Sequence, residues 1–179
     1  MFLTTSAVDQ SILLPVYHVA ASSPVFTWVA IFLAQWLAYL AIGFVVAYIL
    51  FIEEDEKQTF RSLLTLALPV FFAWIVVLLL KLGIHAPRPF VGDLGIMPLV
   101  SVLDPFGSFP SAHATVFGAL FGAMYATRFQ FWRWYGAISL LVAFGRVATG
   151  VHWPSDVLVG LLWGMFAGFW GAKIFAGRK

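Results

Sequence analysis

Long apolar stretches separated by short polar segments divide the chain into candidate membrane spans and loops. Residues 24–52 contain Gln35 as their only strongly polar side chain, and residues 60–80 are apolar apart from Arg61 at the entrance. A helix needs roughly 20 residues to cross a ~30 Å hydrocarbon layer, so both stretches are long enough. We predict two membrane-spanning helices here, joined by the polar turn 53–58.

A proline-rich loop precedes three shorter apolar segments in the second half of the chain. Residues 81–111 mix charged residues with prolines, which is typical of an irregular loop. Apolar segments rich in glycine follow at 111–127, 134–149 and 154–173. If each of them crosses the membrane, the chain is an all-α integral membrane protein with about five transmembrane helices.

The N-terminal segment 1–23 has a different pattern, because polar residues such as Asp9 and His18 interrupt its apolar positions. The apolar residues Ile12, Leu13, Val16 and Val19 nevertheless follow helical spacing. We predict an interfacial helix rather than a span. The whole chain is then one membrane-embedded domain with a helical core over 24–176.

Composition supports a membrane protein and excludes several other classes. Hydrophobic residues make up 62% of the 179 residues and charged residues only 10%, with a mean hydropathy of +0.96, whereas soluble domains carry about 25% charged residues. The net charge of +2 and the lack of a basic run give no indication of nucleic acid as a partner. The absence of cysteine excludes disulfides and thiolate chemistry. The oligomeric state stays open.

The cations are unequally divided between the two membrane faces that alternating spans create. One face carries only Lys81, Arg88 and Arg146. The other face carries most of the cations: Lys57, Arg61, Arg128, Arg133, Lys173, Arg178 and Lys179. The positive-inside rule makes the second face cytoplasmic, so loops 81–113 and 146–156 face the outside or periplasm of a cell membrane.

Three polar stretches meet on this outer face: KLGIHAPRP (81–89), FPSAH (109–113) and RVATGVHWPSD (146–156). Lys81, Arg88 and Arg146 would repel one another unless an anion lay among them, and an Arg guanidinium matches phosphate oxygens in a bidentate manner.

The second of these stretches offers a further anion site. Ser111 precedes an apolar run and is a natural N-cap, and the N–H groups behind it, beginning with Ala112, would face a phosphate. We therefore predict a phosphate-binding site.

Two histidines and a carboxylate provide the chemistry for such a site. We predict that His152 is the nucleophile, that Asp156 orients its ring, and that His113 protonates the leaving oxygen. The alternatives are that His152 and Asp156 form a structural hydrogen-bonded pair or half of a metal site. Three nearby cations oppose a metal ion, so we expect no metal and no cofactor.

These motifs, K-x6-R-P, P-S-x-H and R-x5-H-x3-D, resemble those of the type-2 phosphatidic acid phosphatase superfamily over residues 60–175. The resemblance implies a membrane lipid phosphatase that works through a phosphohistidine intermediate without a metal. Two positions differ from the usual motifs. Ala112 stands where glycine is usual and still offers its backbone N–H, whereas Gly145 replaces a serine, which puts a minor phosphate contact in doubt.

Within this superfamily, the short chain, the outward-facing site and the FPS-x-H form resemble the bacitracin-resistance type of undecaprenyl-diphosphate phosphatase. That resemblance implies hydrolysis of undecaprenyl diphosphate to the monophosphate for cell-wall synthesis, and a role in antibiotic resistance. Phosphatidylglycerol phosphate, phosphatidate or another lipid phosphate is the alternative substrate, and a phosphotransferase is the alternative reaction. An anion transporter is the alternative from another class, although no repeated halves are visible.

The remaining polar and glycine positions have structural explanations. We expect His18 and His85 to be interface or loop residues, although His85 lies within the first motif and its contact with substrate stays open. The GxxxG pair formed by Gly164 and Gly168 is expected to pack between helices of one chain.

Overall fold

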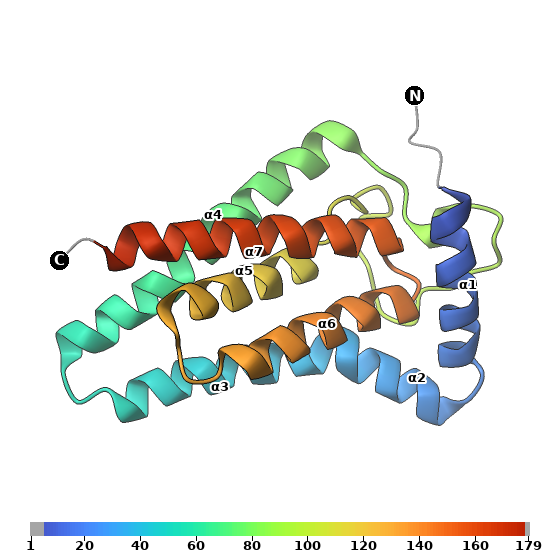
Figure 1. Cartoon of the computed structure of the whole chain (residues 1–179). Coiled ribbons are helices and arrows are strands. Elements are labelled where there is room, and N and C mark those ends of the chain that lie inside the picture. The colour runs from blue at the N-terminus through green and yellow to red at the C-terminus, as the bar shows by residue number, and fades with distance from the viewer. Residues whose placement is uncertain (1–5, 178–179) are drawn as a thin grey trace.

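Each apolar stretch forms a helix in the computed structural model, which describes residues 6–177 (Figure 1). No strand occurs among the described residues, which confirms the all-α class. The helices in chain order are α1 Ala7–Ala21, α2 Pro24–Ile31, the π-helical turn η1 Phe32–Trp36, α3 Leu37–Ile52, α4 Glu56–Ile84, the 3-10 turn η2 Pro89–Val91, α5 Ala112–Thr127, α6 Trp132–Ala148 and α7 Pro154–Ala176.

Three helical segments of the described chain are long and apolar enough to cross a membrane: Pro24–Ile52, Glu56–Val91 and Pro154–Ala176. Helices α5 and α6 have 16 and 17 residues, somewhat fewer than the roughly 20 that a full crossing needs. The total of five crossings therefore stays a prediction.

The polar turn between the first two spans is shorter than the predicted 53–58. The side chain of Asp55 accepts a hydrogen bond from the Lys57 backbone N–H at 3.1 Å and so caps α4, which begins at Glu56. The residues after the cap are polar but already helical. The predicted turn was too long because polar composition alone does not show where a capped helix begins.

Helix α5 lies inside the bundle and packs against α7 through glycines on both helices (Figure 1). A Cβ atom added to Gly164 would lie 2.1 Å from the Thr115 carbonyl oxygen, and one added to Gly168 would lie 2.0 Å from that of Ala119. Gly122 of α5 approaches the Met165 carbonyl of α7 as closely, with a Cβ distance of 2.3 Å. The GxxxG pair thus packs within the chain, as predicted.

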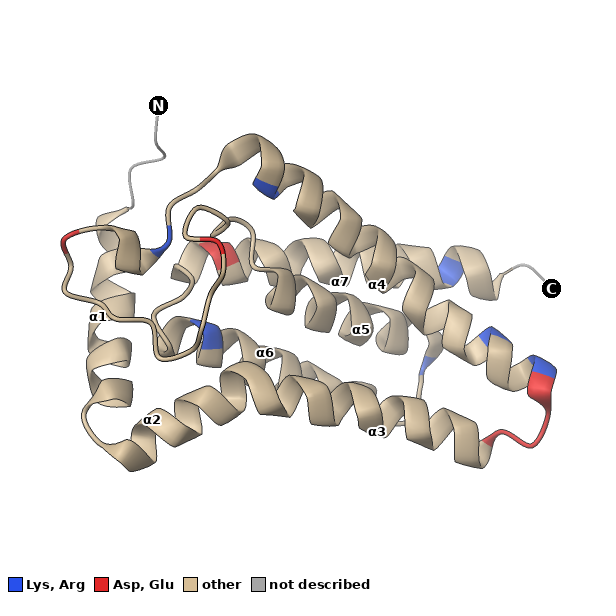
Figure 2. Ribbon diagram, turned by 180° about the vertical axis from the view of Figure 1, so that it is seen from behind, with Lys and Arg blue, Asp and Glu red and all other residues tan. Residues whose placement is uncertain are grey.

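The two ends of the bundle carry most of the charges, and the middle is largely free of them (Figure 2). Helix α3 ends and α4 begins at the turn 53–55, and the two helices diverge from there toward the opposite end, where the chain forms the loops that precede α5. Lys81 in the last turn of α4, Arg88 just before η2 and Arg146 in the last turn of α6 lie at this second end. The acidic turn 53–55 and Lys57, at the start of α4, lie at the first. Arg178 and Lys179 of the predicted cytoplasmic set are outside the described residues.

Helix α1 runs across the second end of the bundle (Figure 1). Asp9, Leu13, Tyr17 and Ala20 are buried, and their spacing of four, four and three residues places them on one side of the helix. The predicted N-terminal helix thus exists, and one of its faces packs on the protein itself.

Candidate active site

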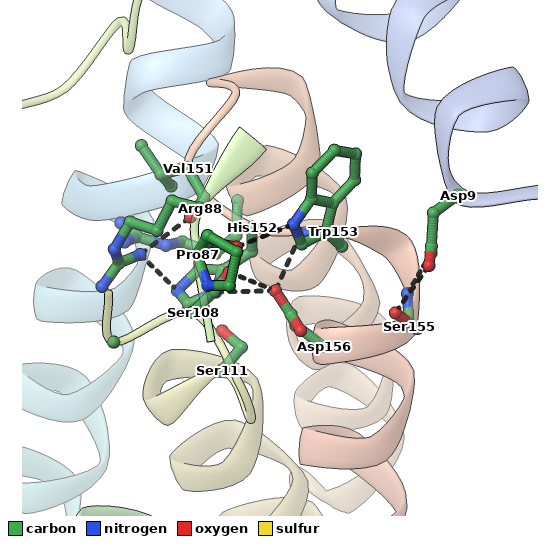
Figure 3. Close-up of polar contacts among 12 residues, drawn as sticks. Asp9, Pro87, Arg88, Ser108, Ser111, Val151, His152, Trp153, Ser155 and Asp156 are labelled. Carbon is green, nitrogen blue, oxygen red and sulfur yellow. Dashed lines mark hydrogen bonds and ion pairs between the residues drawn. The ribbon is translucent and has the colours of Figure 1, made fainter. Parts of the chain in front are cut away.

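The three polar stretches singled out in the sequence are joined by backbone hydrogen bonds at the second end of the bundle (Figure 3). The Ser111 N–H donates to the Asp156 carbonyl at 3.1 Å, and the Ser108 N–H donates to the Ala86 carbonyl at 3.0 Å. The indole N–H of Trp153 donates to the Pro87 carbonyl at 3.0 Å. Residues more than 20 positions apart are thereby fixed relative to one another.

Arg88 connects the loop before α5 to the turn before α7, and only 8% of its surface is exposed. Its Nε donates to the Asp104 carbonyl and its Nη1 to the Val151 carbonyl, both at 2.7 Å. The same Nη1 lies 3.2 Å from Nε2 of His152. Arg88 therefore holds two loops and points a charged donor at the nitrogen predicted to attack phosphorus.

His152 lies in the turn between α6 and α7, Asp156 lies in the first turn of α7, and both are buried. The Nδ1 atom of His152 is 3.5 Å from Oδ2 of Asp156, which is too long for a well-formed hydrogen bond. Oδ2 of Asp156 also accepts a hydrogen bond from the Trp153 backbone N–H at 2.9 Å. With Nδ1 facing the carboxylate, Nε2 is the ring nitrogen directed toward Arg88.

Ser108 is a residue of this site that the sequence analysis missed. It is fully buried, and its hydroxyl donates a hydrogen bond of 2.5 Å to Oδ2 of Asp156. It stands three residues before Ser111, outside the three polar stretches singled out in the sequence. Only its position in the fold distinguishes it from other loop serines. Ser108 thus holds the Asp156 carboxylate, which the sequence predicts to orient the ring of His152.

Replacing Ser108 by alanine is expected to lower kcat by about 10-fold, because a freed Asp156 carboxylate no longer holds the imidazole in one orientation. KM should change little, since Ser108 points at Asp156 and not at the anion. Steady-state phosphate release measures both constants. Ser101→Ala, at an exposed loop position, is the matched control, and equal kcat values for the two variants would contradict the assigned role.

Three buried polar atoms at this site have no hydrogen-bond partner within the described chain: Oγ of Ser111, Nε of Arg146 and Nδ1 of His152. A buried donor or acceptor without a partner costs roughly 1–3 kcal/mol, so such atoms are rare in folded proteins. Ser111 occupies the predicted N-cap position of α5, but its side chain makes no capping hydrogen bond. A phosphate group would satisfy the hydroxyl and the guanidinium together.

The remaining predicted residues also lie at this end of the bundle. The Lys81 ammonium group donates to the Gly107 carbonyl, and its charge interacts with those of Arg88 and Arg146. The charges of all three cations also act on His113, near the start of α5. Ala112 is the first residue of that helix, so its N–H is one of the free donors at the helix N-terminus.

His85 does not join this cluster. It is exposed and ends α4 in the left-handed conformation, with φ of 48°. His18 is likewise exposed on α1. Both placements agree with the structural explanations expected from the sequence.

The environment of His152 favours a neutral imidazole. Burial of the ring, followed by the charges of Arg146, Arg88 and Lys81, lowers the pKa of His152 well below its ordinary value. A neutral imidazole keeps a lone pair on one nitrogen, which nucleophilic attack requires. Desolvation and the cation cluster thus favour the neutral form that the predicted role of His152 as nucleophile requires.

Gly145 is explained by packing rather than by phosphate binding. A Cβ atom at this position would lie 2.5 Å from the backbone N of Ala34 in the π-helical turn η1. The usual serine of the motif would therefore collide with backbone in this protein. Glycine allows α6, which carries Arg146, to approach η1 closely.

An apolar groove extends from His113 along the bundle between α3 and α4. Its first part is lined by Tyr39, Ile42, Trp74 and His113. It continues past Ile42 and Trp74 into a hollow of about 420 Å³ that reaches Ile49 on α3. A polar site at one end of an apolar groove suits an amphipathic ligand whose charged group binds among the cations.

Comparison with known proteins gives consistent matches. Residues 58–179 match the sequence model of the PAP2 superfamily. The Escherichia coli K12 protein named undecaprenyl-diphosphatase YbjG is 32% identical over 153 residues, which cover 80% of this chain and 71% of that protein. A lipid A 1-phosphatase of Rhizobium johnstonii is 36% identical over 111 residues, covering 60% of this chain and 45% of that protein.

Two solved structures share the fold. The crystal structure of Aquifex aeolicus LpxE superimposes with a TM-score of 0.76 at 22% identity, covering 97% of this chain and 99% of that one. The first transmembrane PAP2 type phosphatidylglycerolphosphate phosphatase from Bacillus subtilis gives a TM-score of 0.69 at 24% identity, covering 99% and 90%. The shared arrangement covers α1 as well as the helices that carry the motifs.

Proposed function

Because the chain belongs to the PAP2 superfamily, we propose that it hydrolyses undecaprenyl diphosphate to undecaprenyl phosphate through a phosphohistidine intermediate. The broader class is already established: the protein is a multi-pass membrane lipid phosphatase of PAP2 type. The observation that carries the proposal is the cation cluster with its unpaired buried atoms, continuous with an apolar groove at His113.

The apolar groove and the relatives support a prenyl diphosphate as the substrate. The groove runs along α3 from Tyr39 to Ile49, which corresponds to ~15 Å of helix, about half the ~30 Å hydrocarbon thickness of a membrane. It would hold the first part of a prenyl chain, and the rest would extend into the bilayer. The E. coli relative, matched over most of this chain, is named as an undecaprenyl-diphosphatase.

The geometry also supports a sequence of chemical steps. The terminal phosphate binds between Lys81, Arg88 and Arg146 and accepts hydrogen bonds from Ser111 and the Ala112 N–H. Nε2 of His152 then attacks phosphorus, an N–P bond forms, and the bond to the lipid phosphate oxygen breaks.

Proton transfer completes both halves of the reaction. His113 gives its proton to the leaving oxygen in the first half. In the second half a water molecule gives a proton to His113 and attacks phosphorus, which releases inorganic phosphate and restores His152. Asp156 holds the imidazole throughout, and the cations stabilise charge on the equatorial oxygens.

The charge distribution supports a site on the extracytoplasmic face of the cell membrane. Lys57, Arg61, Arg128 and Lys173 lie near the ends of helices opposite the site. The positive-inside rule makes their end cytoplasmic. A lipid diphosphate on the outer leaflet would then reach His152 laterally, through the groove between α3 and α4.

Phosphate release by purified protein in detergent, with EDTA present, tests the proposed substrate. Prenyl diphosphates of undecaprenyl and farnesyl length should be hydrolysed faster than phosphatidylglycerol phosphate, phosphatidate and lipid A. Preference for one of the other lipids would keep the chemical mechanism and overturn the substrate. Hydrolysis that stops when EDTA is added would contradict the metal-independent mechanism.

The lowered pKa of His152 predicts its titration directly. A lowered pKa means that the neutral ring persists as the pH falls, so His152 should remain neutral at pH ~6.5, where an ordinary imidazole is half protonated. NMR of protein with labelled histidine measures this, and the missing signals of His152→Ala assign the ring. A midpoint at or above ~6.5 would contradict the proposed neutral nucleophile.

A further inference from the structure

Helix α1 carries a buried carboxylate that the proposed chemical steps do not use. Asp9 is only 7% exposed, and its Oδ1 accepts a hydrogen bond from the Ser155 backbone N–H at 2.8 Å. Its Oδ2 accepts from the Ser155 hydroxyl at 2.9 Å and from the Ser6 hydroxyl at 3.1 Å. Figure 3 shows this contact beside Asp156, on the side away from Arg88.

The contact supplies a hydrogen-bond acceptor that the N-cap side chain of α7 does not. The N-cap residue of α7 is Trp153, whose side chain has no acceptor for the free N–H groups of the first turn. Pro154 has no N–H, so Ser155 presents the first one, and Asp9 accepts it from a helix 146 residues away in sequence. A negative charge is also favourable at a helix N-terminus.

A second contact of α1 reaches the other end of the same turn. The hydroxyl of Tyr17 donates to the Met97 carbonyl at 2.9 Å and accepts from the Met97 N–H at 3.0 Å. Its ring lies against Gly150, whose φ of 71° begins the turn that leads to His152. Helix α1 therefore contacts the catalytic turn at Gly150 through Tyr17 and just after it, at Ser155, through Asp9.

We propose that α1 is a brace for this turn and that Asp9 is its positioning residue. By fixing the first turn of α7, Asp9 holds the adjacent Asp156 in place beside Nδ1 of His152. The inference rests on the proposed phosphatase activity, because it concerns the orientation of the nucleophile. It gives the N-terminal helix a role in catalysis in addition to any contact with the membrane.

The brace predicts a specific kinetic effect. Asp9→Ala should lower kcat by about 10-fold or more, because a small displacement of a reacting group is costly. KM should stay within about threefold, since the phosphate is bound by Lys81, Arg88, Arg146 and Ser111, none of which contacts α1 through Asp9. Asp9→Asn should retain most of the activity, because an amide can accept from the Ser155 N–H and donate to its hydroxyl.

The experiment compares kcat and KM for farnesyl diphosphate, together with melting temperatures in detergent. Asp93→Ala, which removes an exposed loop carboxylate, is the matched control and should match the unchanged protein. A kcat for Asp9→Ala within twofold of that protein, or equal losses in the alanine and asparagine variants, would overturn the brace.

If Asp9→Ala does not fold, Tyr17→Phe decides, because loss of the hydroxyl that binds Met97 frees the ring that lies against Gly150. It should lower kcat by about threefold at unchanged KM, and an unchanged kcat would overturn the brace. No hydrolysis by the unchanged protein would overturn the proposed function and the brace together. Activity that is lost in His152→Ala but kept in Asp9→Ala would overturn the brace alone.

Discussion

Replacing His152 by alanine is expected to abolish phosphate release, with a loss of kcat of roughly 10^4- to 10^6-fold, as for removal of other enzymic nucleophiles. The reason is that Nε2 of His152, the proposed nucleophile, lies 3.2 Å from Nη1 of Arg88, one of the cations proposed to bind the phosphate. The carbonyl of Val151 would still hold Arg88 in the variant, so the loops should stay in place. Phosphate release and melting temperature, measured together, separate loss of chemistry from loss of fold.

His18→Ala is the matched control for this variant, because it removes an exposed histidine of α1 away from the cation cluster. It should keep the activity of the unchanged protein. A phosphoprotein trapped during turnover in the unchanged protein and absent from His152→Ala would support the covalent intermediate. Persistent hydrolysis by His152→Ala at even one tenth of the normal rate would contradict the assignment of the nucleophile.

Adding one methyl group at Gly164 is expected to destabilise the protein strongly. The Cβ of alanine would lie 2.1 Å from the Thr115 carbonyl oxygen and 2.8 Å from the Ala119 N, so α7 would have to move away from α5. Overpacking of this kind costs about 1–3 kcal/mol. Because α5 and α7 carry Ser111 and Asp156, activity should fall together with the melting temperature in detergent.

Gly43→Ala provides the comparison within the same chain. No atom lies within 4 Å of a Cβ built at Gly43, which is in the interior of α3. There alanine should be neutral or stabilise by about 0.5–1 kcal/mol, because it loses less conformational freedom than glycine. Equal melting temperatures for the two alanine variants would contradict the close packing of α5 on α7.

The helices and the chemistry at their ends could be predicted from the pattern of residues along the chain. Long apolar runs leave only helices as a way to satisfy backbone groups in a membrane, so the segments at 24–52, 60–80 and 154–173 were predictable. The residue types and spacing around Arg88, His113 and His152 predicted phosphate chemistry, because clustered cations need an anion and the histidines offer a nucleophile and an acid. These features are local, because each depends on residues close together in the chain.

The further residues that support this chemistry are recognised only in the folded protein. Nothing in the sequence distinguishes Ser108 and Asp9 from other polar residues. Folding brings them into contact with Asp156 and Ser155, which are 48 and 146 residues away in the chain. The sequence suggests a lost phosphate contact at Gly145, whereas in the fold this glycine makes room for the backbone of Ala34. Hydrogen bonding and packing act between neighbours in space, and a pattern along one chain does not specify those neighbours.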